Sequence, residues 1–140
     1  MYVDKNLMVM SAQASYGVAT NVTYSAYSID LLTTGRYGDI GKGKPVAMIF
    51  TVDTAFAGTA GAFVTFQVRV DTDLTIDTNS VIVCQTGTIA ITALTAGAVI
   101  VLPIAAGIIG STYDHLGASV LISTQTTTAG AVSAFIGFDY

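Results

Sequence analysis

Alternation of side chains between residues 63 and 70 is the feature that most restricts the fold of this chain. Phe63, Thr65, Gln67 and Arg69 alternate there with Val64, Phe66, Val68 and Val70. Successive side chains of a β-strand point to opposite faces, so this period predicts a strand whose second set faces the core. No stretch combines an apolar stripe of helical period with capping residues. The sequence therefore predicts strands and no long helix.

Short runs rich in Thr, Val, Ile, Tyr and Phe recur along the whole chain, separated by Gly, Asp and Asn. Such runs are typical of strands joined by turns. We expect strands at 21–30, 46–53, 63–70, 80–91 (one strand, or two broken at Gly87), 98–103, 118–124 and 131–138, with loops at 36–44 and 71–79 and turns at 57–61 and 127–130. Residues 7–14 are either an extended arm or the first strand.

Counting these runs gives about eight strands, which predicts an all-β fold: a single-domain antiparallel sandwich of the jelly-roll type. At 140 residues the chain has the length of one domain. We place an N-terminal arm or first strand at 1–20 and the β-sandwich domain at 21–140.

Charged residues are scarce, because they make up 10% of the chain against about 25% in an ordinary soluble domain. All nine acidic residues are Asp, and 52% of the residues are hydrophobic. Much of the surface must then be apolar or covered by small polar residues, and monomers rarely expose large apolar patches. The composition therefore predicts a protein that is packed into an assembly.

Several classes of partner and compartment are disfavoured. The net charge is −4 and only Lys42 and Lys44 among the five basic residues lie close together, so no nucleic-acid partner is expected. Residues 87–110 carry no charge, but Gly97, Pro103 and strand-like alternation argue against a membrane span. The N-terminus does not resemble a secretory signal, and Cys84, the single cysteine, cannot form an internal disulfide.

The run 71–79 contains the one weak candidate for a metal site, formed by Asp71, Asp73 and Asp77. Carboxylate oxygens are what Ca²⁺ binds, but Ile76 stands where the EF-hand pattern needs Gly. The favoured interpretation is a turn in which Asp side chains cap their own backbone. We expect no metal and no cofactor.

Catalytic machinery is not evident either. His115, the only histidine, follows Asp114 directly, and no serine lies in a G-x-S-x-G motif. A small hydrolase centred on His115 is therefore the least favoured function. Cys84 has no basic neighbour in the sequence to lower its pKa, which indicates a small core or interface residue.

Aromatic and apolar residues near the N-terminus are the candidates for an interface. Tyr16, Tyr24, Tyr27 and Tyr37 could form a stacking platform for sugars or bases, but filling of a sheet face or interface is favoured. Residues 1–19 are apolar yet poorly patterned, so we expect them to reach a neighbouring subunit. The predicted interface residues are Tyr2, Leu7, Met8, Met10, Tyr16, Tyr24 and Tyr37.

The order and spacing of several short motifs resemble those of a known family. The motifs are Tyr2-Val3-Asp4-Lys5-Asn6-Leu7, Ser11-Ala12-Gln13-Ala14, Ser28-Ile29-Asp30-Leu31, Asp39-Ile40-Gly41-Lys42-Gly43-Lys44-Pro45, Val52-Asp53-Thr54-Ala55, and Ala129-Gly130-Ala131-Val132-Ser133-Ala134 with Asp139. Together they are similar to the Bbp16-like capsid cement proteins of tailed bacteriophages. The likeness covers roughly the first 55 residues and the end of the chain.

The resemblance implies a jelly-roll subunit, not an enzyme, that binds the outside of an icosahedral head and stabilises contacts between major capsid subunits. It implies the major capsid protein and further copies of this chain, as a dimer or trimer, as partners. The location implied is the capsid surface of the virion, after synthesis in the host cytoplasm. The alternatives are a carbohydrate-binding β-sandwich and a tail-associated module.

Overall fold

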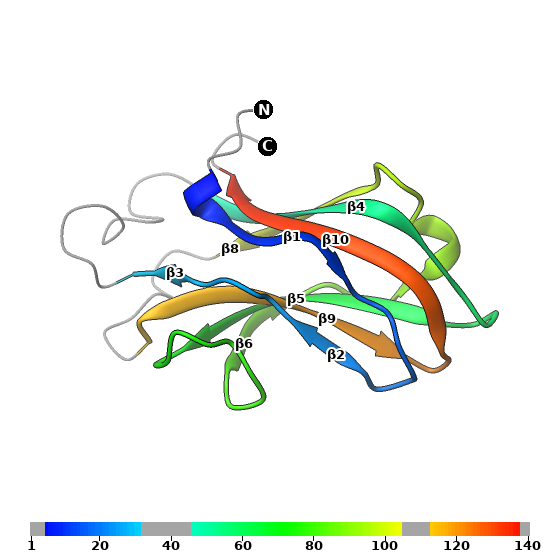
Figure 1. Ribbon diagram of the computed structural model, residues 1–140, viewed down its shortest axis with the longest axis horizontal. Coiled ribbons are helices and arrows are strands. Elements are labelled where there is room, and N and C mark those ends of the chain that lie inside the picture. Colours follow the sequence, from blue (N-terminus) through cyan, green and yellow to red (C-terminus); the bar gives the residue numbers. More distant parts are fainter. Residues whose placement is uncertain (1–4, 32–45, 105–112, 138–140) are drawn as a thin grey trace.

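Two antiparallel β-sheets pack face to face in the computed structural model, which describes residues 5–31, 46–104 and 113–137 (Figure 1). The strands are β1 (Met8–Ala14), β2 (Val22–Tyr24), β3 (Ile29–Asp30), β4 (Val46–Gly58), β5 (Phe63–Asp71), β6 (Val81–Gln85), β7 (Ile89–Ala90), β8 (Val99–Ile104), β9 (His115–Ser123) and β10 (Thr127–Gly137). Short 3₁₀ turns, η1 (Lys5–Leu7) and η2 (Ile91–Ala93), are the helical elements of the described residues. No helix in these ranges is long and apolar enough to cross a membrane.

The order of the strands interleaves the two halves of the chain. Sheet A has the order β1-β10-β4-β8, and sheet B has the order β2-β9-β5-β6, with β3 also paired to β9 and β7 to β5. Strands from the start and the end of the sequence therefore lie side by side in both sheets, as in a jelly roll. The all-β sandwich predicted from the sequence is confirmed.

The core fills the space between the sheets. Phe50 of β4 and Phe66 of β5 meet across it, with ring centroids 5.0 Å apart. Val64, Val68 and Val70 are fully buried beside Phe66, so the set of β5 residues predicted to face the core does so. Each sheet contributes alternate residues, as the period of a strand requires.

Four strand boundaries differ from the prediction. The strand predicted at 118–124 already begins at His115, as β9. Residues 21–30 form two short strands, β2 and β3, and both pair with β9. The strand predicted at 46–53 continues to Gly58 as β4. The turn predicted at 127–130 is part of β10, because Thr127 already pairs with Gly58. The break predicted as an alternative at Gly87 is present, between β6 and β7.

Residues 8–14 form a strand of the sandwich and not a free arm. β1 pairs with β10 at the edge of sheet A, and Val9 and Met10 are fully buried in the core. The Gln13 side chain ties this edge to sheet B: its Nε2 donates to the Tyr24 carbonyl at 2.6 Å, and its Oε1 accepts from the Ala26 N–H at 3.0 Å. The Tyr27 N–H donates to the Val9 carbonyl at 3.1 Å. This side of the sandwich is closed by hydrogen bonds.

Candidate interaction surfaces

A buried arginine lies on the outer face of sheet B. Arg69 of β5 is only 7% exposed, although its alternation places it away from the core. Its Nε donates to Ser119 Oγ at 2.7 Å, Nη1 to the Ser80 carbonyl at 3.0 Å, and Nη2 to Gln67 Oε1 at 3.0 Å. The guanidinium carbon also lies 5.1 Å from the centre of the Tyr24 ring, within the range of a cation–π contact. The Arg69 cation thus donates to neutral oxygens of three residues, and this network holds those residues together on the outer face of sheet B.

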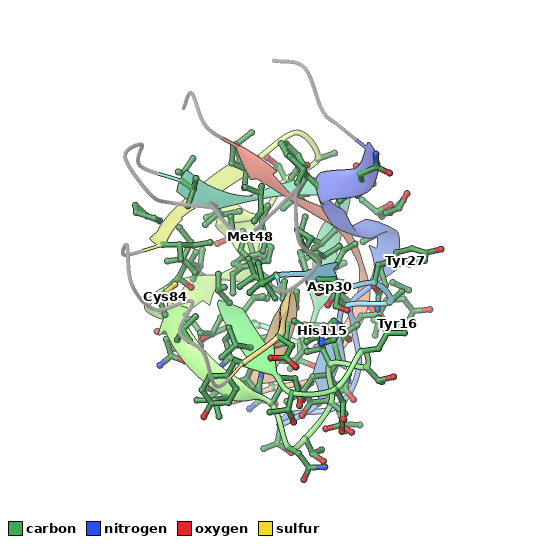
Figure 2. All side chains as sticks on the ribbon, turned by 90° about the vertical axis from the view of Figure 1, so that its left-hand side faces the viewer. Tyr16, Tyr27, Asp30, Met48, Cys84 and His115 are labelled. Atoms are coloured by element: carbon green, nitrogen blue, oxygen red, sulfur yellow. The ribbon has the colours of Figure 1, made fainter. Side chains whose placement is uncertain are left out.

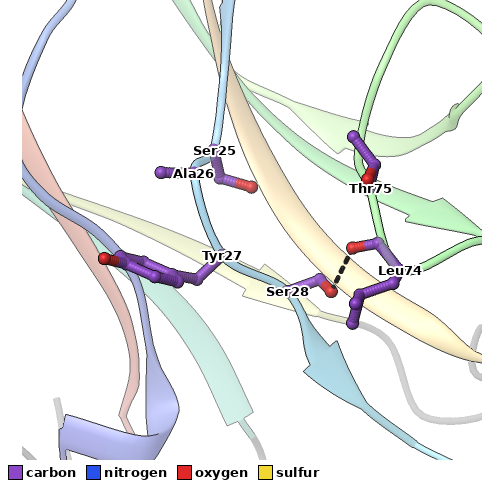
Figure 3. Close-up of a pocket in the computed structure, with 6 residues that line it drawn as sticks. All are labelled: Ser25, Ala26, Tyr27, Ser28, Leu74 and Thr75. Carbon is purple, nitrogen blue, oxygen red and sulfur yellow. Dashed lines mark hydrogen bonds between the residues drawn. The ribbon is translucent and has the colours of Figure 1, made fainter.

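The loop between β5 and β6 covers part of that face. Ile76 is buried directly over Gly117 of β9, where an added Cβ would lie 2.5 Å from Ile76 Cγ1. Ser80, at the end of the loop, accepts from Arg69. On its other side, the Ser28 hydroxyl donates to the Leu74 carbonyl at 2.6 Å (Figure 3). The loop is therefore packed onto the sheet, which explains why Arg69 is buried.

Carboxylates in this loop cap their own backbone. Asp71 Oδ1 accepts from the Asp73 N–H at 3.1 Å, and Asp77 Oδ1 accepts from the Asn79 N–H at 2.7 Å. Within residues 5–31, 46–104 and 113–137, no three His, Cys, Asp or Glu side chains are grouped so as to hold a metal ion. The arrangement fits the turn interpretation of this segment, and we do not propose an ion site.

His115 lies between two carboxylates in the register of sheet B. It pairs with Asp30 of β3 on one side (Figure 2) and with Asp71 of β5 on the other. Its Nδ1 and Asp71 Oδ2 are buried and have no hydrogen-bond partner among the described residues. Neither of these two partners carries a hydroxyl or thiol group, so neither could act as a nucleophile activated by His115.

Cys84 occupies a half-buried position on β6, in register with Val68. Desolvation by burial raises the pKa of the thiol, so its reactive thiolate form is disfavoured. The side chain packs against the core and behaves as a small apolar residue.

The predicted interface residues are separated by the fold. Leu7 and Met10 are buried in the core of the sandwich, so they are removed from the interface: their apolar character reflects packing of η1 and β1. Met8 is half-buried, Tyr16 is exposed, and Tyr24 stacks on Arg69. Tyr2 and Tyr37 lie outside the described residues.

Tyr27, one of the four tyrosines considered as a stacking platform, lines two adjoining pockets. The side chain is 63% exposed and points away from the body of the protein (Figures 2 and 3). The first pocket has a volume of about 230 Å³ and the second about 470 Å³, and both are lined by Tyr27 and Ser28. The remaining lining residues are Ser25, Ala26, Leu74 and Thr75 in the first pocket and Asn6, Met8 and Ser11 in the second. Hydroxyl groups and apolar side chains therefore surround an exposed aromatic ring on this surface.

An apolar surface lies on the opposite side of the sandwich, where the edge strands β6 and β8 contact each other. Val81 and Ile82 of β6 are 42% and 41% exposed, and Val99 and Val101 of β8 are 54% and 38% exposed. Neither strand contains a charged residue. We call these four residues the edge patch. The uncharged stretch 87–110 contains β8, but the contact between β8 and β6 could be recognised only from the fold.

Comparison with known proteins gives one family. The family model Bbp16 matches residues 12–136 of the chain. No curated protein matches it. Among solved structures, the chain is similar to one in the structure of infectious bursal disease virus Gx strain, with a TM-score of 0.48 and 11% identity. The match covers 95% of this chain and 32% of the viral one.

Proposed function

This chain belongs to the Bbp16 family, and we propose that it is a capsid cement, or decoration, protein of a tailed bacteriophage. In this role it binds the outer surface of the head and stabilises contacts between major capsid subunits. The single observation that carries the proposal is the family match, which extends over residues 12–136. The partners are then the major capsid protein and further copies of this chain, and its place is the surface of the virion after synthesis in the host cytoplasm.

The physical character of the domain supports a structural role. The described residues form a sandwich with few charges, and the edge patch exposes apolar side chains that a partner would cover. Stable protein contacts bury about 1,600 Å² in total. On a repeating shell, several smaller contacts reinforce one another because each bound copy holds its neighbours at high effective concentration.

The contact residues proposed on the N-terminal side are Met8, Tyr16 and Tyr24, together with Tyr2 and Tyr37. Tyr16 is the most exposed of the three described ones, and an aromatic side chain supplies a large contact area at low entropic cost. Replacing Tyr16 by Ala is expected to weaken binding to heads while leaving the unfolding temperature unchanged.

Copy number in purified virions tests the proposal directly. Quantitative mass spectrometry is expected to find this chain at a level comparable to the major capsid protein, and added protein is expected to raise the temperature at which heads that lack it break open. A few copies per particle would indicate the tail-associated alternative. Absence from virions would reject a structural role in the particle.

A carbohydrate-binding module is the second candidate, and the Tyr27 pockets are the observation that favours it. An exposed aromatic ring can stack on a sugar face, and the nearby hydroxyls of Ser28 and Thr75 can bond to its hydroxyl groups. In that case Tyr27→Ala would abolish glycan binding in solution. Wild-type protein that binds no glycan would exclude this candidate.

A further inference from the structure

Four segments form one end of the sandwich, at the right-hand side of Figure 1. They are the connection between β1 and β2 (15–21), the hairpin between β4 and β5 with the end of β4 (57–62), η2 with the residues after it (91–97), and the turn between β9 and β10 with its adjoining residues (123–128). All four lie within the described ranges, and none contains a charged residue or a histidine. We call these four segments the uncharged end.

Main-chain hydrogen bonds join the four segments of the uncharged end into one surface. Three of them run between neighbouring segments, from the Thr127 N–H to the Gly17 carbonyl (2.8 Å), from the Thr59 N–H to the Thr126 carbonyl (2.9 Å) and from the Ile91 N–H to the Ala62 carbonyl (3.3 Å). A surface that is fixed before it meets a partner loses little conformational entropy on binding. The uncharged end is therefore preorganised for a contact.

The charged side chains of the described residues lie away from this end. Asp53 is the nearest along the chain, and its carboxylate accepts a hydrogen bond from the Ser133 hydroxyl at 2.7 Å on the outer face of sheet A. Asp71, Asp73 and Asp77 lie where β5 ends, a full strand length from the hairpin. A contact made with those three residues would have to desolvate carboxylates or pair them with cations, whereas a contact made with the uncharged end avoids that cost.

From this distribution of charge we propose that the protein docks on the head through the uncharged end, against an uncharged area of the major capsid protein. The inference rests on the proposed function. Interface cores are depleted of charged residues and enriched in aromatic ones. Tyr16 and Val18, 49% and 66% exposed, are the large exposed apolar side chains of this end and supply the central contact. The facing surface must also lack charge, because an ion buried against this end would find no counter-ion.

A second copy of this chain is a poorer occupant of the uncharged end than the shell. Sixteen residues of the four segments are exposed, whereas a stable pair of proteins usually contributes about 20–30 residues from each side. Two molecules joined through this end alone would therefore be held weakly. On a repeating shell a small contact is sufficient, because other contacts of the same molecule keep it at high effective concentration.

Matched pairs of charge substitutions test the proposal. Val18 at the uncharged end is replaced by Asp and, separately, by Lys. Thr78 in the loop between β5 and β6 receives the same two substitutions as the control, because it is also exposed and both sites then change the net charge equally. The full-length variants are sedimented with heads that lack the protein. The melting temperature and the oligomeric state of each variant are measured on the protein alone.

Both Val18 variants are expected to bind heads roughly tenfold more weakly than wild type or worse, because a charge of either sign loses its hydration in an uncharged contact. The Thr78 variants are expected to bind like wild type. All variants should melt close to wild type, since exposed substitutions change stability little. If a Val18 variant does not fold, the same two substitutions at Thr95, an exposed residue of the uncharged end, decide.

Normal binding by both folded Val18 variants overturns this docking surface and leaves the cement function standing. Weakening by one sign of charge alone shows a charged partner surface, and equal weakening by the Thr78 variants places the contact elsewhere; each of these results also overturns the inference. A wild-type oligomer that the Val18 variants dissociate while they still bind heads shows a second copy at this end instead. If wild type does not bind heads, this inference and the proposed function fail together.

Discussion

Truncating Met10 to alanine tests whether residues 8–14 are part of the folded domain. Met10 is fully buried and belongs to the core between the sheets. Removing a buried Met side chain costs about 2–5 kcal/mol, from lost apolar burial and the cavity left behind. At about 2.1 cal/mol/K per residue, unfolding of a 140-residue domain has an entropy near 0.3 kcal/mol/K. The midpoint temperature should therefore fall by roughly 7–17 °C.

Met8→Ala is the matched control, because Met8 is only half-buried in the same strand. Its cost is expected to stay below about 1 kcal/mol. Both variants are unfolded thermally and in urea, where an unchanged m-value shows that the same surface is exposed on unfolding. If Met10→Ala is no less stable than Met8→Ala, β1 is not packed in the core and residues 1–20 act as a detachable arm.

Three further perturbations address the outer face of sheet B and the cysteine. Gly117→Val drives a side chain into Ile76, so we expect a loss of about 1–3 kcal/mol and faster hydrogen exchange at 72–80; unchanged exchange would contradict the packed loop. Arg69→Lys cannot reproduce bonds from Nε, Nη1 and Nη2 together, and urea unfolding should show a loss of about 1–3 kcal/mol; equal stability would argue against the network. Burial raises the pKa of Cys84, so its alkylation should reach half its maximal rate at a higher pH in the folded chain than in urea. As pH rises, the unfolded chain loses this proton first, so the Cys84 contribution lowers stability at alkaline pH; identical alkylation profiles would refute it.

The alternation of β5 predicted its core-facing residues but not the surroundings of its other face. Period two fixes the direction of a side chain, so Val64 and Phe66 could be assigned to the core from sequence. The same pattern directs Gln67 and Arg69 outward, yet both are buried. Their burial depends on the loop 72–80, whose position is set by Ile76 packing on Gly117. Such a contact between distant residues leaves no local pattern.

Glycine positions misled the prediction of the last strand for a similar reason. The run 127–130 has the composition of a turn, but Thr127 is held in place by distant residues: its N–H donates to the Gly17 carbonyl at 2.8 Å, and its hydroxyl accepts from the Gly17 N–H at 3.1 Å. Gly130 serves close approach, because an added Cβ would lie 2.5 Å from the Phe56 ring. A glycine that admits a neighbouring ring cannot be told from a turn glycine by sequence alone.

The apolar residues near the N-terminus could not be assigned to the core or to an interface from the sequence. Composition indicates that apolar surface must be covered, but it does not distinguish cover by the core from cover by a partner. The fold makes that distinction: Met10 is enclosed between the sheets, whereas Val99 and Val101 remain exposed on a sheet edge.

The few polar contacts described above are distributed unevenly over the sandwich. Gln13 joins the two sheets at the side of β1 and β2, and Arg69 holds the loop that covers sheet B. A strand edge left open by chance invites aggregation, so it is normally blocked. Within the described residues, one side of the sandwich is closed by hydrogen bonds, whereas β6 and β8 on the other side expose apolar side chains. This asymmetry agrees with the proposed structural role, in which a partner covers exposed apolar side chains.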